Sequence, residues 1–236
     1  MSTPPTIAMP DHVVFDDVLS PVDFEAIQRH LARERFSDVH EGVGGHGRVW
    51  TQADGRPLRG PAFASASILP ASDIDTDAFH VACVPLLHAI AGCMPHIGTV
   101  AGVEGRDWQG IAARAWLHPP GTGLGWHDDS RSYAGAFVFF AHPVWRLDWA
   151  GELMLLEGRP EPADDAGTES IPSALLAPLG LPASAGGRFI VARPNRLVIL
   201  ASGVLHRVAP VSVLAGHHVR ATISGFFLRT QSSEAA

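Results

Sequence analysis

Two residues with metal-binding side chains stand two positions apart in the segment "GWHDDS", residues 125–130. His127 offers an imidazole nitrogen and Asp129 offers a carboxylate oxygen, and both are common ligands of divalent transition metals. In an extended chain, residues two apart project to the same face, so these two side chains can converge on one point while Asp128 turns away. The spacing therefore predicts a pair of ligands for one metal ion.

A third ligand has to come from another strand, and "VLHRVAPV", residues 204–211, offers His206 among apolar residues. Two imidazoles and one carboxylate on one face of an ion give the facial arrangement of non-haem Fe(II) oxygenases, which leaves three coordination positions open. The chain has 13 histidines and 24 acidic residues, so a His-x-Asp triplet also arises by chance. The spacing alone is therefore weak evidence.

Two helices are predicted ahead of the segments that carry these residues. Residues 20–36 have Ser20 as a cap and a proline in the first turn, and residues 75–93 form a second helix that Pro85 kinks or divides. Each has one apolar stripe. The stripes consist of Phe24, Ile27 and Leu31 in the first helix and of Phe79, Cys83, Leu86 and Ile90 in the second.

From residue 111 onward the apolar pattern shortens to runs typical of strands, separated by Gly, Pro, Asn and Asp. A helical lead-in followed by many short strands indicates helices on one face of a β-sandwich or jelly roll. Residues 157–187 are too long and too rich in Pro, Ala and Gly for a hairpin turn, so they form either a lid or a floppy insertion. We expect residues 1–236 to form one domain, with residues 1–110 as helical lead-in and supporting strands and residues 111–229 as the β core.

The charge of the chain limits its partners. The formal net charge is -7, and all 17 basic residues are arginine. Binding to nucleic acid or to an anionic membrane depends on clustered cations, so we expect neither partner. Any carboxylate on a ligand has to be met by a guanidinium, which suits bidentate contact.

The remaining composition indicates the compartment. Cys83 and Cys93 are too few for a disulfide framework and lie in an apolar segment, where a small buried residue is typical. The N-terminal residues lack a basic region followed by an apolar stretch, and no run of 18 apolar residues occurs. We therefore expect a cytoplasmic protein that does not enter a membrane. A homodimer is compatible with the sequence.

Four motifs in the second half of the chain resemble, in order and content, the prolyl-hydroxylase-like branch of the 2-oxoglutarate/Fe(II)-dependent oxygenases. They are "HPPGTGLGWHDDS", "WAGELMLLE", "RPNRLVILASGVLHRVAPV" and "VRATISGFF", within residues 111–229. The resemblance implies an α+β, mainly β fold: a double-stranded β-helix of the jelly-roll or cupin-like type, with N-terminal helices packed on one face. It also implies Fe(II), the cosubstrate 2-oxoglutarate and O2 as cofactors.

Carried over by position, the resemblance makes His127, Asp129 and His206 the iron ligands. It also places Arg220 where relatives have a basic residue that holds the distal carboxylate of 2-oxoglutarate. The apolar strand around Arg220 supports this role, because a buried, unpaired guanidinium is costly without an anionic ligand. A surface ion pair is the alternative for Arg220.

Relatives often carry a tyrosine a few residues before the first histidine, and this chain departs from that pattern. His118 or Trp116 stands near the position, and the only tyrosine is Tyr133. We expect His118 to supply the hydrogen bond to the cosubstrate. A histidine packed at the end of a strand is the alternative.

The implied reaction is hydroxylation of an unactivated C–H bond, with release of succinate and CO2. Trp116, Trp126 and Arg131 are the candidate substrate contacts, although ordinary packing also accounts for them. They suit a small molecule with an apolar part and an acid group, such as an amino acid or a natural-product intermediate. A peptidyl-prolyl or other protein hydroxylase is the alternative, and a non-catalytic jelly-roll module that binds metal or ligand is an alternative of another class.

Overall fold

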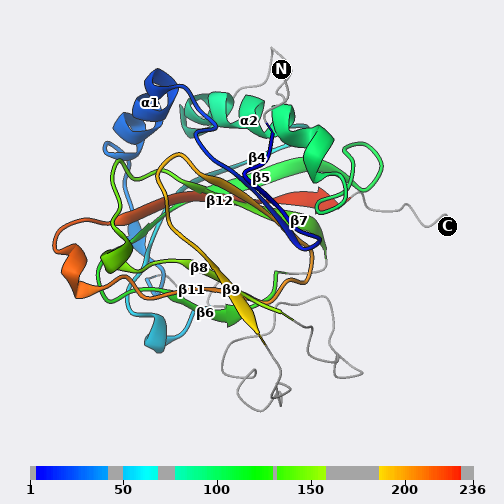
Figure 1. Ribbon diagram of the computed structural model, residues 1–236. Helices are drawn as coiled ribbons and strands as arrows, with labels where there is room; N and C mark the ends of the chain where they lie inside the picture. Colours follow the sequence, from blue (N-terminus) through cyan, green and yellow to red (C-terminus); the bar gives the residue numbers. More distant parts are fainter. Residues whose placement is uncertain (1–3, 42–49, 69–77, 130–131, 158–185, 230–236) are drawn as a thin grey trace.

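The computed structural model describes residues 4–41, 50–68, 78–129, 132–157 and 186–229, and in these ranges the strands form two antiparallel sheets that face each other (Figure 1). The large sheet has the order β1-β2-β10-β7-β12-β5-β4-β3 and the small sheet the order β6-β11-β8-β9. The strands of the large sheet are β1 (Ile7–Ala8), β2 (His12–Phe15), β3 (Ser37–Asp38), β4 (Leu58–Ser65), β5 (Trp108–His118), β7 (Tyr133–Phe140), β10 (Leu197–Ala201) and β12 (Arg220–Arg229). Those of the small sheet are β6 (Leu124–His127), β8 (Leu153–Leu156), β9 (Gly187–Ile190) and β11 (His206–Val208).

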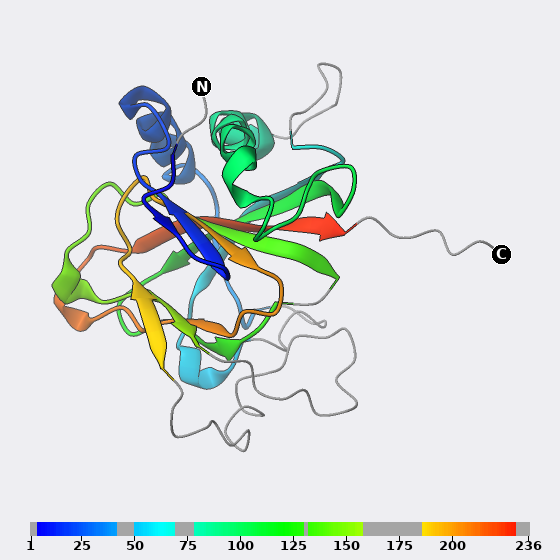
Figure 2. The ribbon, with the colours of Figure 1, turned by 45° about the vertical axis from the view of Figure 1, so that its right-hand side comes forward.

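Both helices cover the outer face of the large sheet, as the sequence predicts (Figure 2). The first, α1 (Pro21–Leu31), begins at Ser20, whose side chain accepts a hydrogen bond from the backbone N–H of Asp23. It ends five residues before the expected boundary at residue 36. The reason is that the chain tightens into i→i+3 turns at residues 33 and 34 and then enters β3, which pairs with β4.

The second helix, α2 (Ala78–Ile97), extends four residues beyond the expected end at residue 93, and its expected start at residue 75 lies outside the described residues. It runs without interruption through Pro85 and Pro95, so Pro85 does not divide it, and of the two expected outcomes only a kink is left. By length and composition alone α2 could cross a membrane. Cys83, Cys93 and six other residues of this helix are buried, however, and it packs with the large sheet as a core helix.

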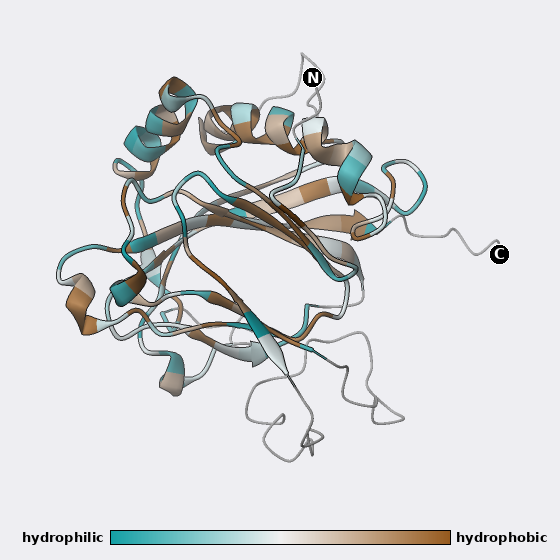
Figure 3. Cartoon of the chain, in the orientation of Figure 1, coloured by the Kyte–Doolittle hydropathy of each residue, from teal (hydrophilic) through white to brown (hydrophobic). Residues whose placement is uncertain are grey.

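The large sheet has a core on each of its faces, and strand alternation separates them. On β7, Phe137 and Phe139 pack in the cluster with the helices, whereas Ala136 and Phe140 pack in a second cluster between the sheets. Hydrophobic residues accordingly predominate along these strands (Figure 3). The large sheet is therefore fixed from outside by the helices, and its inner face is available to line a site.

The architecture confirms the expected double-stranded β-helix with helices on one face. Strands β1 to β4, which lie before residue 111, extend the large sheet at both edges. Three short 3-10 helices connect elements in the described ranges: η1 (Gln52–Asp54), η2 (Leu147–Trp149) and η3 (Val213–Ala215). Most of the segment 157–187, for which we expected a lid or an insertion, lies outside the described residues.

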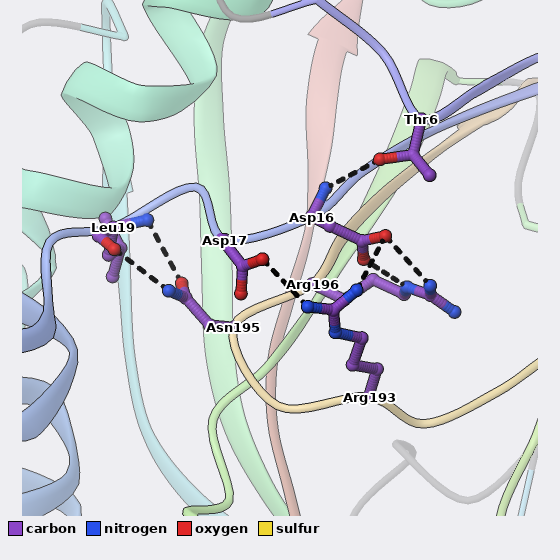
Figure 4. A network of polar contacts seen from close by, with 7 residues as sticks. All are labelled: Thr6, Asp16, Asp17, Leu19, Arg193, Asn195 and Arg196. Atoms are coloured by element: carbon purple, nitrogen blue, oxygen red, sulfur yellow. Dashed lines mark hydrogen bonds and ion pairs between the residues drawn. The ribbon is translucent and has the colours of Figure 1, made fainter.

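A polar network ties the N-terminal segment to the loop before β10 (Figure 4). Arg196 donates from Nε and Nη2 to the two carboxylate oxygens of Asp16, at 2.7 and 3.1 Å, and Arg193 contacts the same carboxylate at 3.2 Å. The side chain of Asn195 exchanges two hydrogen bonds with the backbone of Leu19. These contacts hold the segment that leads into α1 against the jelly roll.

Asp16→Asn is expected to destabilise the protein at neutral pH by about 1 kcal/mol or less, the range for a partly solvated ion pair. Burial raises the pKa of Asp16, but the hydrogen bonds and charge of Arg196, together with the charge of Arg193, lower it below its usual value of 3.8. The stabilisation is therefore present above pH 3.8 and disappears as the pH falls through the lower, folded-state pKa. Urea unfolding at a series of pH values tests this. A difference between wild type and variant that persists unchanged in strong acid contradicts it.

Candidate metal centre

The two histidines predicted as ligands are direct cross-strand partners in the small sheet. Residue 206 on β11 pairs with residue 127 on β6. Both side chains are buried, and their ring centroids are 4.2 Å apart. Facing positions of an antiparallel pair bring side chains together, so the strand register itself assembles two thirds of the site.

Asp129 completes the cluster from just beyond the end of β6. Its Oδ2 is 3.7 Å from Nε2 of His206. One ligand atom from each of His127, Asp129 and His206 lies within 4.8 Å of the others, a separation that suits coordination of one ion. The structure therefore brings together all three residues that the sequence singled out.

The imidazole rings are held in an orientation that suits metal binding. Nδ1 of His127 bonds the carbonyl of Gly125, and Nδ1 of His206 bonds the carbonyl of Val204, each at 2.8 Å. Each Nδ1 therefore carries the proton, which leaves Nε2 of both rings as a lone-pair donor. Burial, with a smaller contribution from His206, lowers the pKa of His127 to about 3, so this ring is neutral.

Burial raises the pKa of Asp129, and Asp128 adds to the effect, whereas His206 opposes it. A largely buried carboxylate beside two imidazole ligands is costly by itself, and a bound cation relieves that cost. Two imidazoles and one carboxylate on one side of an ion fit the facial set of non-haem Fe(II). The donor set thus fits a metal that keeps open coordination positions.

A residue that the sequence did not reveal supports this centre from behind. The buried side chain of Asp54, in η1, accepts a hydrogen bond at 2.7 Å from the backbone N–H of Gly125. It also accepts from the backbone and hydroxyl of Thr51. Gly125 is the residue whose carbonyl receives Nδ1–H of His127, so Asp54 acts on the metal ligand through one peptide unit.

Asp54→Ala is expected to weaken metal binding by about 10-fold, at the lower end of the effect of residues behind metal ligands. The side chain of His127 then loses the fixed carbonyl that orients it. Titration of Ni(II) into the metal-free protein, followed by calorimetry, measures the change. Asp54→Asn is the matched control and should lose less, because its amide oxygen still accepts from Gly125. Equal affinity of the alanine variant and the wild type contradicts the role.

The cluster opens into a cavity of about 510 Å³ between the sheets. One wall is the inner face of β5 and β12, where the register aligns His118 with Arg220 and Trp116 with Thr222. Its lining is mainly apolar and also contains the three ligands, the aromatic Trp50 and Tyr133, and Arg114.

Arg220 is buried and lines this cavity, and no carboxylate of the described residues forms an ion pair with it. Its Nε donates to the carbonyl of Gly151 at 2.7 Å, whereas Nη2 has no partner among the described residues. Burial lowers its pKa to about 9, although Glu152 opposes the shift, and the guanidinium lies 4.9 Å from the ring centroid of Phe140. The surface ion pair considered for this residue is thus not what the structure shows. A free N–H group of a buried cation instead points to an anionic ligand.

His118 lies beside this guanidinium and is also buried. Neither ring nitrogen has a hydrogen-bond partner among the described residues. Burial lowers its pKa well below the usual value, and the charge of Arg220 lowers it further. His118 is therefore a neutral polar group that faces the cavity and has both hydrogen-bonding positions available.

The three candidate substrate contacts have different outcomes. Trp116 lines the cavity and packs against Trp50, with ring centroids 5.3 Å apart. Trp126 does not line it: the Trp126 ring packs against the guanidinium of Arg207 instead, because Trp126 and His127 are neighbours in an extended strand and project to opposite faces. Arg131 lies outside the described residues.

The sequence has no match among protein-family models and no significant match among curated proteins. Solved structures are similar, however. A prolyl-4-hydroxylase from Pseudomonas putida superposes with a TM-score of 0.53 at 15% identity, over 93% of this chain and 93% of that one. A prolyl hydroxylase from Trichoplax adhaerens, in complex with a peptide fragment of the hypoxia inducible factor, has a TM-score of 0.57 at 12% identity, over 94% and 84%.

HygX from Streptomyces hygroscopicus, with nickel, 2-oxoglutarate and hygromycin B bound, has a TM-score of 0.54 at 12% identity, over 96% of this chain and 86% of that one. At such identities the likeness concerns the fold. The chain therefore has the double-stranded β-helix fold of the 2-oxoglutarate/Fe(II) oxygenases, as the motif resemblance implied.

Proposed function

We propose that this protein is an Fe(II)- and 2-oxoglutarate-dependent oxygenase that hydroxylates a C–H bond of a small molecule and releases succinate and CO2. The observation that carries the proposal is that one cavity is lined by both a His-Asp-His cluster and a buried guanidinium, whose Nη2 has no hydrogen-bond partner in the described part of the chain. The first suits a metal with open positions and the second suits the far carboxylate of a keto diacid.

The three metal ligands have defined tasks in this function. His127 and His206 present Nε2 because their Nδ1–H groups are held by backbone carbonyls, and Asp129 supplies the anionic ligand. When bound, Fe(II) with 2-oxoglutarate supplies the activation of O2 and the oxidation of the C–H bond.

The other residues bind and position the cosubstrate. Arg220 holds the distal carboxylate of 2-oxoglutarate through the N–H groups that Gly151 does not use. His118 lies beside it and hydrogen-bonds the cosubstrate. The apolar lining keeps water away, so the reacting groups meet in a dry and fixed arrangement.

A small molecule is favoured as the substrate by the cavity itself. A volume of about 510 Å³ lies within the range of small-molecule sites, as does an apolar lining with a few polar groups. A peptidyl proline is the second candidate, because two of the similar structures are prolyl hydroxylases.

A binding module without turnover is disfavoured, since the metal cluster alone would not need a buried cation nearby. Arg220 contacts none of the three ligands through a hydrogen bond or ion pair among the described residues. The hydrogen bond to Gly151, the charge of Glu152 and the ring of Phe140 offset part of the cost of its burial, and an anionic ligand would offset the rest.

Anaerobic addition of Fe(II) and 2-oxoglutarate tests the proposal. A visible charge-transfer band is expected, and admission of O2 with a panel of amino acids, natural-product intermediates and proline-containing peptides should raise succinate release for one class. Stimulation by peptides alone would favour the protein hydroxylase. If folded protein gives no band and releases no succinate, the oxygenase assignment is wrong.

A further inference from the structure

The inner face of β5 carries a second guanidinium in the cavity. Alternate residues of this strand, Ala112, Arg114, Trp116 and His118, line the cavity, as strand geometry requires. The register aligns Arg114 with Ser224, whereas Arg220 is aligned with His118, four residues further along. At a rise of about 3.3 Å per residue, the backbone positions of the two arginines are roughly 13 Å apart along the sheet.

Arg114 has no carboxylate partner within ion-pair distance among the residues that the structure describes. Its Nη1 donates to the carbonyl of Gly60 at 2.8 Å, and its Cζ is 5.8 Å from the ring centroid of Trp116. Gly60 lies where the register of β4 with β5 shifts between Arg59 and Ala62, and this irregularity leaves its carbonyl to accept from a side chain. The guanidinium is thus anchored at one end, with its other N–H groups still able to donate.

The surroundings of Arg114 favour an anion. Burial lowers its pKa, and so does the nearby charge of Arg59, a second arginine without an ion pair in the described ranges. Arg59 uses its own donors on Ser37 and the carbonyl of Glu41. Two like charges close together, neither of them neutralised by a described carboxylate, give this end of the cavity a positive potential.

We infer that Arg114 binds a carboxylate of the substrate and so selects carboxylic acids that carry a flat apolar group. This inference rests on the proposed function. The cosubstrate does not explain Arg114, because a five-carbon diacid held by Arg220 at one end and by the metal at the other does not extend to the aligned position of Ser224. The carboxylate at Arg114 therefore belongs to a different molecule.

The cavity wall between the two arginines indicates the shape and polarity of the rest of the substrate. Trp50 and Trp116 lie in contact on this wall, and small residues at positions 62, 112 and 136 on strands of the same sheet also line the cavity and leave room beside them. Aromatic rings of this kind bind flat apolar groups by stacking. The substrate would place its acid group on Arg114, its apolar part along the tryptophans, and the oxidised carbon toward His127 and His206.

Calorimetry on protein loaded with Ni(II), which replaces Fe(II) so that no turnover occurs, tests the inference. With 2-oxoglutarate at saturation, the probes are benzoate, phenylacetate and 3-phenylpropanoate, each compared with its neutral amide. At least one carboxylate is expected to bind about 10-fold or more tightly than its amide, the effect of a charge-assisted hydrogen bond. Arg114→Gln should abolish that preference and Arg114→Lys should keep part of it.

The affinity for 2-oxoglutarate distinguishes failure of the role inferred for Arg114 from failure of the proposed oxygenase function. It should stay within about twofold in both Arg114 variants, and Arg146→Gln, a change at an exposed arginine paired with Asp148, should keep the preference for carboxylates. If the preference survives in Arg114→Gln, or if wild type binds 2-oxoglutarate but prefers no carboxylate, Arg114 has only a structural role. If wild type does not bind 2-oxoglutarate, the proposed function fails and this inference fails with it.

Discussion

Asp129→Ala is expected to release no succinate above the background without enzyme and to bind Ni(II) more than about 100-fold less tightly than wild type, since loss of a ligand exceeds the effect of a residue behind one. Two imidazole ligands then remain, with no anion to balance the charge of the ion. Nickel titration by calorimetry and succinate measurement after addition of Fe(II), 2-oxoglutarate and O2 report the two effects separately.

Asp128→Ala is the matched control, because it removes the adjacent carboxylate, which is not part of the cluster of ligand atoms. It should bind Ni(II) within a fewfold of wild type. It should also lose a source of like charge that raises the pKa of Asp129. Succinate release by Asp129→Ala at the wild-type rate would show that the carboxylate does not hold the metal.

The three ligands could be predicted from the sequence because their signals are local. The two-residue spacing of His127 and Asp129 needs only an extended chain, and the apolar neighbours of His206 mark a buried strand. Their pairing across β6 and β11 is a non-local fact of register, which the family motifs implied and spacing alone did not. The same alternation argument, applied one residue earlier, would have excluded Trp126 from the cavity.

Other parts of the site are invisible in the sequence for a physical reason. Asp54 is 71 residues from Gly125, and a single aspartate near Gly and Pro is typical of an ordinary turn. Arg114 stands between two alanines in a strand, and its lack of a described carboxylate partner becomes visible only when the neighbours across β4 and β12 are known. The end of α1 likewise depends on the pairing of β3, since helix propensity does not stop the chain at Leu31.

Arg220→Met should weaken the binding of 2-oxoglutarate without lowering the stability of the protein. Removal of one partner of a buried charged hydrogen bond costs about 2–5 kcal/mol, so the dissociation constant of 2-oxoglutarate is expected to rise at least about 30-fold. The free protein should unfold at the same temperature as wild type or higher. The loss of the hydrogen bond to Gly151 is offset because a cation with an unpartnered N–H group leaves the core. Thermal unfolding of the Ni(II)-loaded protein, with and without 2-oxoglutarate, measures both effects.

Arg196→Met supplies the contrast, because this guanidinium is also largely buried but has its carboxylate, Asp16, in two-point contact. Its loss leaves Asp16 without its main partner, so this variant should unfold at a lower temperature and still gain the full stabilisation that 2-oxoglutarate gives to wild type. The two variants thus distinguish a buried arginine that stabilises the folded protein, Arg196, from one that does not, Arg220. If Arg220→Met unfolds as early as Arg196→Met and still responds to 2-oxoglutarate, then Arg220 belongs to the framework and the anion site lies elsewhere.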